Sequence, residues 1–286
     1  SMYANAGYTF DSRYSVNAGI RVDQSNLFGT DPSIQFKPIW SVGAAWNAMN
    51  EAFLKDVAWV NKLSLRVSYG LGGNSPTSTM GGPFNIMSAS TAYQNIAPGV
   101  TYYINSPAND KIHWEKTATT NVGLDFAFFK HRLYGSFDFY NKHTTDLLST
   151  KELDSTVGAA TITSNVGSIL NRGVELMIGG PILRTRSFMW DMSANFTYNK
   201  SLVEEIYHTP FTKASEILSQ TNTGYMEGYP IRPVFAYTWG GLDPDNGTPR
   251  IIKGDGTVYS GAYSNLPVED VKYMGTTIPP YFGSIS

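Results

Sequence analysis

The chain has 286 residues, a formal net charge of −2 and no cysteine. Charged residues make up only 15% of it, against about 25% in typical soluble proteins, while aromatic residues reach 14%. The lack of cysteine excludes disulfides and a cysteine nucleophile, and the lack of a long Lys or Arg run argues against nucleic acid as a partner. This composition favours contact with lipid or carbohydrate.

Apolar and polar residues alternate strictly along about eight segments of the sequence. In residues 62–72, for example, Leu65 and Val67 alternate with Arg66 and Ser68. Successive side chains on a strand point to opposite faces, so each segment is predicted to form a strand with one apolar and one polar face. The segments are, in chain order, residues 2–10, 14–22, 40–47, 62–72, 118–128, 132–142, 172–182 and 188–199.

These strands are long enough to cross a bilayer when tilted, which takes roughly 9 to 11 residues. No run approaches the 18 or so apolar residues that a membrane-spanning helix needs. Arg or Lys facing lipid at mid-bilayer costs roughly 2 to 4 kcal/mol, so charges should turn to the inside of a barrel. The charged residues of the polar faces are therefore predicted to line a lumen: Arg21, Arg66, Asp125, Asp138, Glu175 and Asp191.

The connections alternate between short and long, as the periplasmic turns and extracellular loops of outer-membrane barrels do. Short turns are predicted at 11–13, 130–131 and 184–186, with a medium connection at 48–61 on the same side. Long loops are predicted near 23–37, 74–112, 146–168 and 201–280. Their Gly, Pro, Ser and Asn content predicts irregular backbone. Five tryptophans near strand ends fit interfacial girdles: Trp40, Trp46, Trp59, Trp114 and Trp190.

The sequence therefore predicts an all-β protein: one domain over residues 1–286, formed by part of an antiparallel transmembrane β-barrel. Residues 1–3 enter a strand directly, and residues 280–286 stop where a further strand would begin. We expect the sheet to be incomplete by itself, with two unpaired edges. The isolated chain should therefore not be stable in buffer without detergent.

Several segments in series resemble barrel blocks of the SusC/RagA family of TonB-dependent outer-membrane transporters. The matching segments are YTFDSRY at 8–14, PIWSVGAAWN at 38–47, LRVSYGLGGN at 65–74, WEKT at 114–117, NVGLD at 121–125, DFY at 138–140, TDLL at 145–148 and NRGVEL at 171–176. The resemblance covers nearly the whole chain. It implies a 22-stranded plugged barrel in the outer membrane, of which this chain supplies about eight strands.

The resemblance also implies a function without covalent chemistry or a cofactor. Family members import oligosaccharides or peptides with energy transmitted by TonB, which engages N-terminal parts outside this chain. They pair with a SusD-like lipoprotein that caps the extracellular mouth. Loop aromatic residues are then expected to contact the ligand or the lid, although simple loop packing is an equal alternative: Tyr93, Tyr102, Tyr103, Trp114, Tyr225 and Trp239.

Other motifs carry weaker predictions. The four histidines have no metal-ligand spacing, and residues 243–247 (DPDNG) favour a turn over a cation site. Asp125 and Asp138 resemble a glycosidase pair, but a polar lumen wall needs such charges in any case. The rival functions are a soluble carbohydrate-binding or glycan-degrading β protein, and a passive porin or autotransporter barrel.

Overall fold

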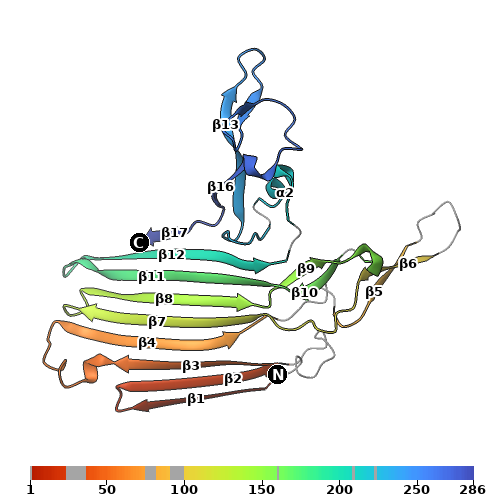
Figure 1. Ribbon diagram of the computed structural model, residues 1–286. Helices are drawn as coiled ribbons and strands as arrows, with labels where there is room; N and C mark the ends of the chain where they lie inside the picture. Colours follow the sequence, from red (N-terminus) through yellow and green to blue (C-terminus); the bar gives the residue numbers. More distant parts are fainter. Residues whose placement is uncertain are drawn as a thin grey trace. The chain divides into compact units, whose positions relative to one another are not determined.

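A nine-stranded antiparallel sheet dominates the first of two compact units, which comprises Ser1–Lys200 and Pro280–Ser286 (Figure 1). The fold is that of a computed structural model, which describes residues 2–23, 37–74, 82–90, 100–159, 161–207, 210–221 and 224–286. The strand order is β1-β2-β3-β4-β7-β8-β11-β12-β17. The strands are β1 (Met2–Phe10), β2 (Tyr14–Asp23), β3 (Lys37–Asn47), β4 (Val60–Gly72), β7 (Lys116–Phe128), β8 (Leu133–Thr145), β11 (Gly167–Arg184), β12 (Met189–Ile206) and β17 (Tyr281–Ile285).

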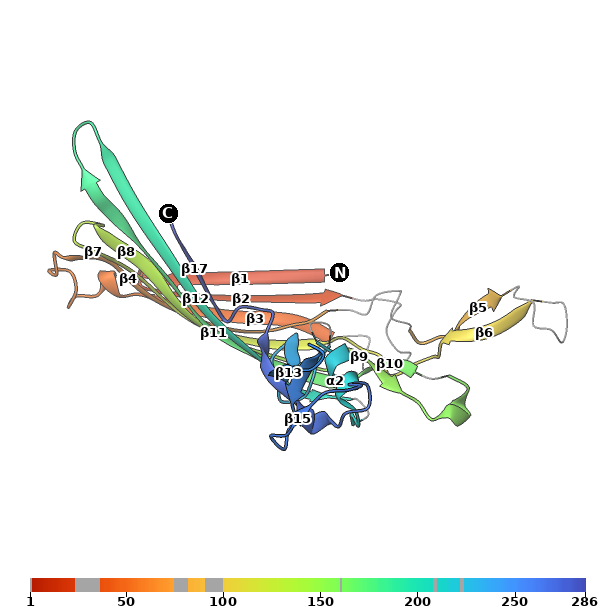
Figure 2. The same cartoon turned by 90° about the horizontal axis from the view of Figure 1, so that it is seen from above.

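All eight predicted strands are present, and the ninth, β17, forms where a further strand was expected to begin. β11 and β12 are longer than predicted, at 18 residues each. The strand direction rotates from β1 to β12, which is the usual twist of a sheet (Figure 2). β1 and β17 are the two edges, so the sheet of this chain is not closed.

The register joins the alternating residues into two continuous walls. Directly opposed residues of antiparallel strands lie on the same face, and the pairing carries one apolar row from β1 to β11. That row is Tyr8, Val16, Ala44, Val67, Val122, Phe139 and Val174. The neighbouring row, on the opposite face, is Thr9, Ser15, Ala45, Arg66, Gly123, Asp138 and Glu175. We call these faces the apolar wall and the polar wall.

The apolar wall is uncovered by the described residues of this unit. Val67 is 43% exposed and Phe139 is 39% exposed, although both lie in the middle of long strands. Burial of a Val or Phe side chain is worth about 1.5 to 3 kcal/mol, so a soluble sheet would cover such a face. The wall therefore needs an apolar environment outside the chain.

The short and long connections lie at opposite ends of the sheet, as predicted (Figure 1). The short ones span 11–13, 48–59, 129–132 and 185–188. The longer of these, 48–59, begins with the 3-10 helix η1 (Ala48–Asn50) and is tied to the neighbouring hairpin through Glu51. The Glu51 carboxylate accepts hydrogen bonds from Tyr14 Oη (2.5 Å) and Trp46 Nε1 (3.2 Å) and contacts Arg13 (3.3 Å).

The prediction of irregular backbone in the long connections is wrong for several stretches. β5 (Ile86–Ser90) pairs with β6 (Thr101–Ser106), and β9 (Leu148–Glu152) pairs with β10 (Thr161–Asn165). These strands have five or six residues, too few to show a clear alternation beside the surrounding Gly and Pro. The surrounding turn residues concealed these short paired segments in the sequence.

The second unit, Ser201–Pro279, has a sheet and core of its own. Its strand order is β15-β14-β13-β16, with β13 (Pro233–Leu242), β14 (Pro249–Ile252), β15 (Val258–Tyr259) and β16 (Val271–Thr276). The short helix α2 (Ala214–Ser219) contributes Ala214 to a core with Ile251 and Leu266. No helix within the described ranges is long and apolar enough to cross a membrane.

The turn between β1 and β2 offers a test of the hairpin geometry. Asp11 and Ser12 both have positive φ (49° and 54°), and Arg13 N donates to Phe10 O at 2.9 Å, as in a type I′ turn. Non-glycine residues in this conformation cost roughly 1 to 2 kcal/mol. We expect Ser12→Gly to raise the free energy of unfolding by about 1 kcal/mol, measured by urea titration of the intact protein in lipid vesicles. Ser15→Gly, inside β2, should lower it; stabilisation by both variants would contradict this turn.

Candidate functional site

An ion cluster occupies the centre of the polar wall, where it joins β4, β7 and β8. The Arg66 guanidinium contacts the Asp125 carboxylate through two hydrogen bonds, both of 3.1 Å. Its Nη2 also lies 3.2 Å from Asp138 Oδ1, and Lys62 Nζ lies 3.6 Å from Asp125. The structure thus brings together three residues that were predicted to share one face.

Gly123 makes this cluster possible. It lies between Arg66 and Asp138 in the same row of the sheet. A Cβ atom at Gly123 would collide with Asp138 Oδ1 and would lie 2.7 Å from Arg66 Nη2. Because glycine has no side chain, the guanidinium crosses β7 and reaches the strand beyond it.

Glu175 extends the cluster on β11, directly opposite Asp138. The group then holds three carboxylates (Asp125, Asp138 and Glu175) against two cations (Arg66 and Lys62), which leaves one excess negative charge. Asp125 and Asp138 both engage the same guanidinium. This arrangement fits a hydrated polar wall better than a pair of catalytic carboxylates.

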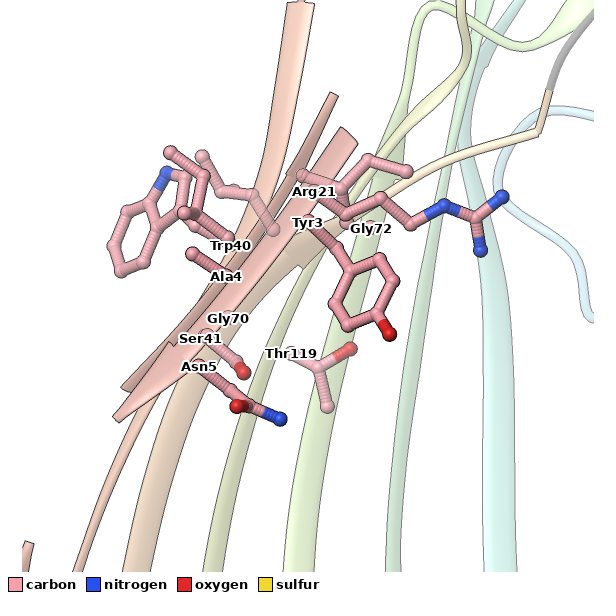
Figure 3. A pocket seen from close by; sticks show the side chains of 13 residues that line it. Tyr3, Ala4, Asn5, Arg21, Trp40, Ser41, Gly70, Gly72 and Thr119 are labelled. Carbon is pink, nitrogen blue, oxygen red and sulfur yellow. The ribbon is translucent and has the colours of Figure 1, made fainter. Parts of the chain in front are cut away.

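The polar wall also carries a floor of small residues beside the edge strand β1. Asn5, Gly19, Ser41, Gly70 and Thr119 form one row across β1, β2, β3, β4 and β7. They line an open cavity of about 450 Å³ together with Tyr3 and Arg21. Tyr3, Arg21 and Thr119 project on one side of the sheet and Trp40 on the other (Figure 3).

The predicted residues Arg21 and Asp191 lie apart from the ion cluster. The Arg21 side chain is 62% exposed and forms a local ion pair with Asp23 at 2.8 Å. Asp191, on β12, lines a different open cavity near the short connections, with Tyr134 and Arg132. The six predicted lining residues therefore occupy three places rather than one.

A hydrogen-bonded junction of His113, Asp146 and Asn165 holds two of the long connections together. The Asn165 side chain donates to His113 O (2.9 Å) and Asp146 O (2.7 Å) and accepts from His113 N (3.0 Å). Asp146 Oδ2 in turn lies 2.6 Å from Lys116 Nζ and 3.5 Å from His113 Nε2. The sequence analysis did not predict this junction, because nothing in the sequence around a single Asn indicates which distant residues it contacts.

Asp146 should make the stability of this junction sensitive to low pH. Burial alone would raise the pKa of Asp146, but Lys116 and His113 outweigh it and hold that pKa below its ordinary value of 3.8. The resulting stabilisation is complete above that ordinary value and is lost as the pH falls through the lower, folded pKa. We expect the protection of the Leu147 and Val166 amides against hydrogen exchange, relative to the intrinsic exchange rate at each pH, to fall below about pH 3.8.

Asp146→Asn provides the matched variant for this pH test. Asp146 has a positive φ of 57°, which Asn tolerates well, so the backbone is retained while the titrating group is lost. The variant should exchange faster at neutral pH and show a weaker acid dependence. An unchanged acid dependence in Asp146→Asn would assign it to another group.

The predicted loop aromatics have different environments. Tyr102 and Tyr103 on β6 are 66% and 53% exposed, whereas Trp114 is half-buried and its ring lies beside Gly73. In the second unit, Tyr225 and Trp239 are exposed. Tyr93 lies outside the described residues. Exposure thus leaves four of these rings accessible to a partner.

Within the described ranges, no group of three or more His, Asp or Glu side chains is arranged to hold a metal ion. The Asp243 carboxylate instead accepts a hydrogen bond from Asp245 N at 3.0 Å, and Asp243 O accepts one from Gly247 N at 2.8 Å. These contacts form a turn, the structure that the DPDNG sequence favoured.

Comparison with protein families gives a match to TonB dependent receptor-like β-barrels over residues 1–282. The chain is 35% identical over 245 residues to TonB-dependent receptor P39 of Formosa agariphila, covering 83% of this chain and 22% of that protein. It is 29% identical over 278 residues to TonB-dependent receptor SusC of Bacteroides thetaiotaomicron, covering 91% of this chain and 27% of SusC. The chain therefore spans about a quarter of the length of these relatives.

Solved structures with the same fold include the RagAB peptide transporter. That structure superposes with a TM-score of 0.79 and 26% identity, covering 99% of this chain and 31% of the other. The open-open state of the RagAB peptide importer gives a TM-score of 0.80 at 25% identity, covering 98% of this chain and 29% of the other. The fold, the family model and the relatives all indicate a TonB-dependent receptor β-barrel.

Proposed function

Because the chain belongs to the SusC/RagA family of TonB-dependent receptors, β-barrel proteins of the outer membrane, we propose that it forms part of the wall of an active nutrient importer. The observation that carries this proposal is the continuous separation of apolar and polar rows across the sheet. Outer-membrane localisation does not fit the soluble glycan-binding or glycan-degrading alternative. The relatives are receptors and transporters, not enzymes.

In this proposal the apolar wall is in contact with lipid and the polar wall with water. The apolar wall faces lipid, where its exposed Val, Leu and Phe side chains lose contact with water. The polar wall lines the lumen, with the Arg66 cluster, Glu175 included, at its centre and Arg21 and Asp191 apart from it. The ion cluster supports this orientation, because each of its charges would cost roughly 2 to 4 kcal/mol, or somewhat less for the acids, on the lipid side.

The long connections form the extracellular mouth and the short ones face the periplasm. Support comes from their separation at opposite ends of the sheet and from the usual loop lengths of outer-membrane barrels. A SusD-like lipoprotein caps this mouth, and TonB supplies energy through parts of the protein outside this chain. The exposed rings of Tyr102, Tyr103, Tyr225 and Trp239 are available to the lid or the ligand.

The ligand is an oligosaccharide or a peptide, and the small-residue floor of the polar wall is one place where it lies. Gly19, Ser41 and Gly70 leave room above the sheet, and Tyr3 and Arg21 offer a ring face and a cation beside it. Sugar rings and extended peptides both suit such a surface, because each combines a flat apolar part with many hydrogen-bonding groups. The floor lies in the half of β4 nearest the long connections.

Uptake by cells that make the intact protein tests this function. We expect uptake of a labelled oligosaccharide or peptide pool, and we expect a protonophore to abolish it because TonB requires an energised inner membrane. Uptake that persists with the protonophore would support the porin alternative. Uptake of neither pool would overturn the proposed substrate class.

Two glycine variants test the floor itself. A Cβ at Gly19 would meet Ser41 Oγ at 3.7 Å, an ordinary contact, so Gly19→Val is expected to place its two methyl groups in the cavity. Gly7, on the same wall but outside the cavity, also has room, with Val16 O at 3.8 Å from its Cβ. We expect Gly19→Val to lower uptake several-fold and Gly7→Val to leave it unchanged at equal surface expression. Equal uptake by both variants would remove the floor from the transport path.

Photo-crosslinking tests the lid contact. A photoreactive residue at Tyr103, on the long-connection side, should crosslink to a surface lipoprotein in intact cells. The same residue at Phe53, which is 67% exposed on the short-connection side, should not. A crosslink from Phe53 and none from Tyr103 would reverse the proposed orientation.

A further inference from the structure

Three polar side chains lie in one row at the end of the apolar wall nearest the long connections. Thr120 on β7 pairs with Asn141 on β8, and Asn141 pairs with Arg172 on β11, so the three share a face of the sheet. We call them the polar triad. The next row on the same face belongs to the apolar wall and consists of Val122, Phe139 and Val174. The triad therefore lies where that wall ends.

Asn141 orients the guanidinium of Arg172. Arg172 Nε donates a hydrogen bond to Asn141 Oδ1 at 2.8 Å, and the arginine side chain is exposed. Among the described residues, no carboxylate lies within ion-pair distance of Arg172. Its two terminal nitrogens, the Asn141 side-chain amide and the Thr120 hydroxyl are all hydrogen-bond donors. The triad thus presents one oriented cation and two neutral donors.

No carboxylate belongs to this face of β7, β8 and β11, all of which lie within the described ranges. Alternation assigns the face to the even positions of β7 and β11 and the odd positions of β8, none of which is Asp or Glu. Asp125, Asp138 and Glu175 of these strands belong to the polar wall. Asp146, just beyond β8, is paired with Lys116. An anion at the triad would therefore find donors without an opposing carboxylate on these strands.

The position of Arg172 along β11 matches the border of a membrane. On its face the following residues are aliphatic or glycine: Val174, Leu176, Ile178, Gly180 and Ile182. The ten residues from Arg172 to Ile182 span about 33 Å of strand. A strand tilt of about 35 to 45° reduces this span to about 25 Å along the membrane normal, which is the height of the lipid-facing band of outer-membrane barrels. Arg172 therefore lies at the level of the headgroups.

An aromatic pair marks the same level independently. Tyr69 on β4 is directly opposite Thr120, in the same row as the triad, and it is 40% exposed. Its ring centroid lies 5.7 Å from that of Trp40 on β3. Tyr and Trp gather at the boundary between hydrocarbon and water, where one part of the ring is apolar and the other is hydrated. The row that holds the triad is therefore an interfacial row.

We propose that the polar triad binds the phosphate of lipid A, the phosphorylated glycolipid of the outer leaflet, with its acyl chains against Val122 and Phe139. An arginine fork binds phosphate oxygens through parallel charge-assisted hydrogen bonds, and the Asn and Thr donors suit the remaining oxygens or the sugar hydroxyls. The proposal rests on the proposed contact of the apolar wall with lipid. It also rests on the long connections facing outward, since lipid A belongs to the outer leaflet.

Native mass spectrometry of the intact protein in detergent tests this site, with monophosphoryl lipid A and its dephosphorylated counterpart as probes. We expect the unmodified protein to retain the phosphorylated form about tenfold more strongly. Arg172→Gln should retain both forms equally, and Arg172→Lys should recover part of the preference because it restores the charge. Lys142→Gln is the matched control, since it removes a cation next to Asn141 in sequence but on the polar wall. It should keep the tenfold preference.

Several outcomes would overturn the proposal. One is equal retention of the two probes by the unmodified protein, and another is an undiminished preference in Arg172→Gln or an equal loss in Lys142→Gln. Equal, Arg172-dependent retention of phosphatidylglycerol would also overturn it, because the site would then accept phospholipids of either leaflet. Heat-dependent mobility in gels verifies that each variant is folded. Absence of the phosphate preference together with protonophore-sensitive uptake would remove this site and leave the proposed transport function standing.

Discussion

Val67→Arg should lower the free energy of unfolding in lipid vesicles by about 2 to 4 kcal/mol, because it places a guanidinium in the middle of the apolar wall. Val67 pairs with Ala44 and Val122 there, so no carboxylate is directly opposite to compensate the charge. The next residue, Ser68, points to the polar wall, and Ser68→Arg should change the same quantity by about 0.5 kcal/mol or less. Urea titration of both refolded variants measures the difference.

The comparison between neighbours makes this test specific. Both variants introduce the same side chain into the same strand, one residue apart, so strand propensity and net charge change equally. Similar losses in both would mean that β4 is covered on both faces. A larger loss in Ser68→Arg would mean that the assignment of the two walls is reversed.

Arg66→Gln should lower the free energy of unfolding by about 2 kcal/mol, because it leaves the three carboxylates of the cluster with Lys62 as the cluster's remaining cation. This expected loss is smaller than that for breaking a fully buried ion pair, because the side chains of Arg66, Asp125 and Asp138 are 42%, 21% and 19% exposed. Asp138→Asn in the Arg66→Gln background should recover part of the loss. A double-mutant cycle on these two residues measures their coupling directly.

Arg21→Gln is the control for the ion cluster. Arg21 lies on the same wall, but its only described ion pair is the local one with Asp23, and its side chain is 62% exposed. The substitution should change the free energy of unfolding by about 0.5 kcal/mol or less. Equal losses in Arg66→Gln and Arg21→Gln, or additive losses in the double-mutant cycle, would contradict a coupled cluster.

The sheet was predictable because its signal is local. The strict alternation in residues 62–72 specifies which side chains share a face whatever their partners are, and the structure confirms β4 over Val60–Gly72. The same holds for β7 and β8, whose arms have 13 residues each. Length and alternation together left few alternatives for these segments.

The sites were less predictable because they depend on register. Asp125 and Asp138 were expected on one face, but only the pairing places Gly123 between Arg66 and Asp138. The second unit was assigned to a loop, since β14 and β15 have four and two residues and show no alternation. Its core forms through Ile251 and Leu266, which are distant along the chain from Ala214.

Site-directed spin labelling at Val67 and Ser68 tests the central claim most directly, and the chain contains no native cysteine to interfere. With Val67→Cys labelled, the intact protein in lipid vesicles should show frequent collisions with oxygen and few with an aqueous nickel chelate. The label at Ser68→Cys should show the opposite preference. A label at position 67 that meets the nickel chelate and is shielded from oxygen would contradict the account of two walls in two solvents.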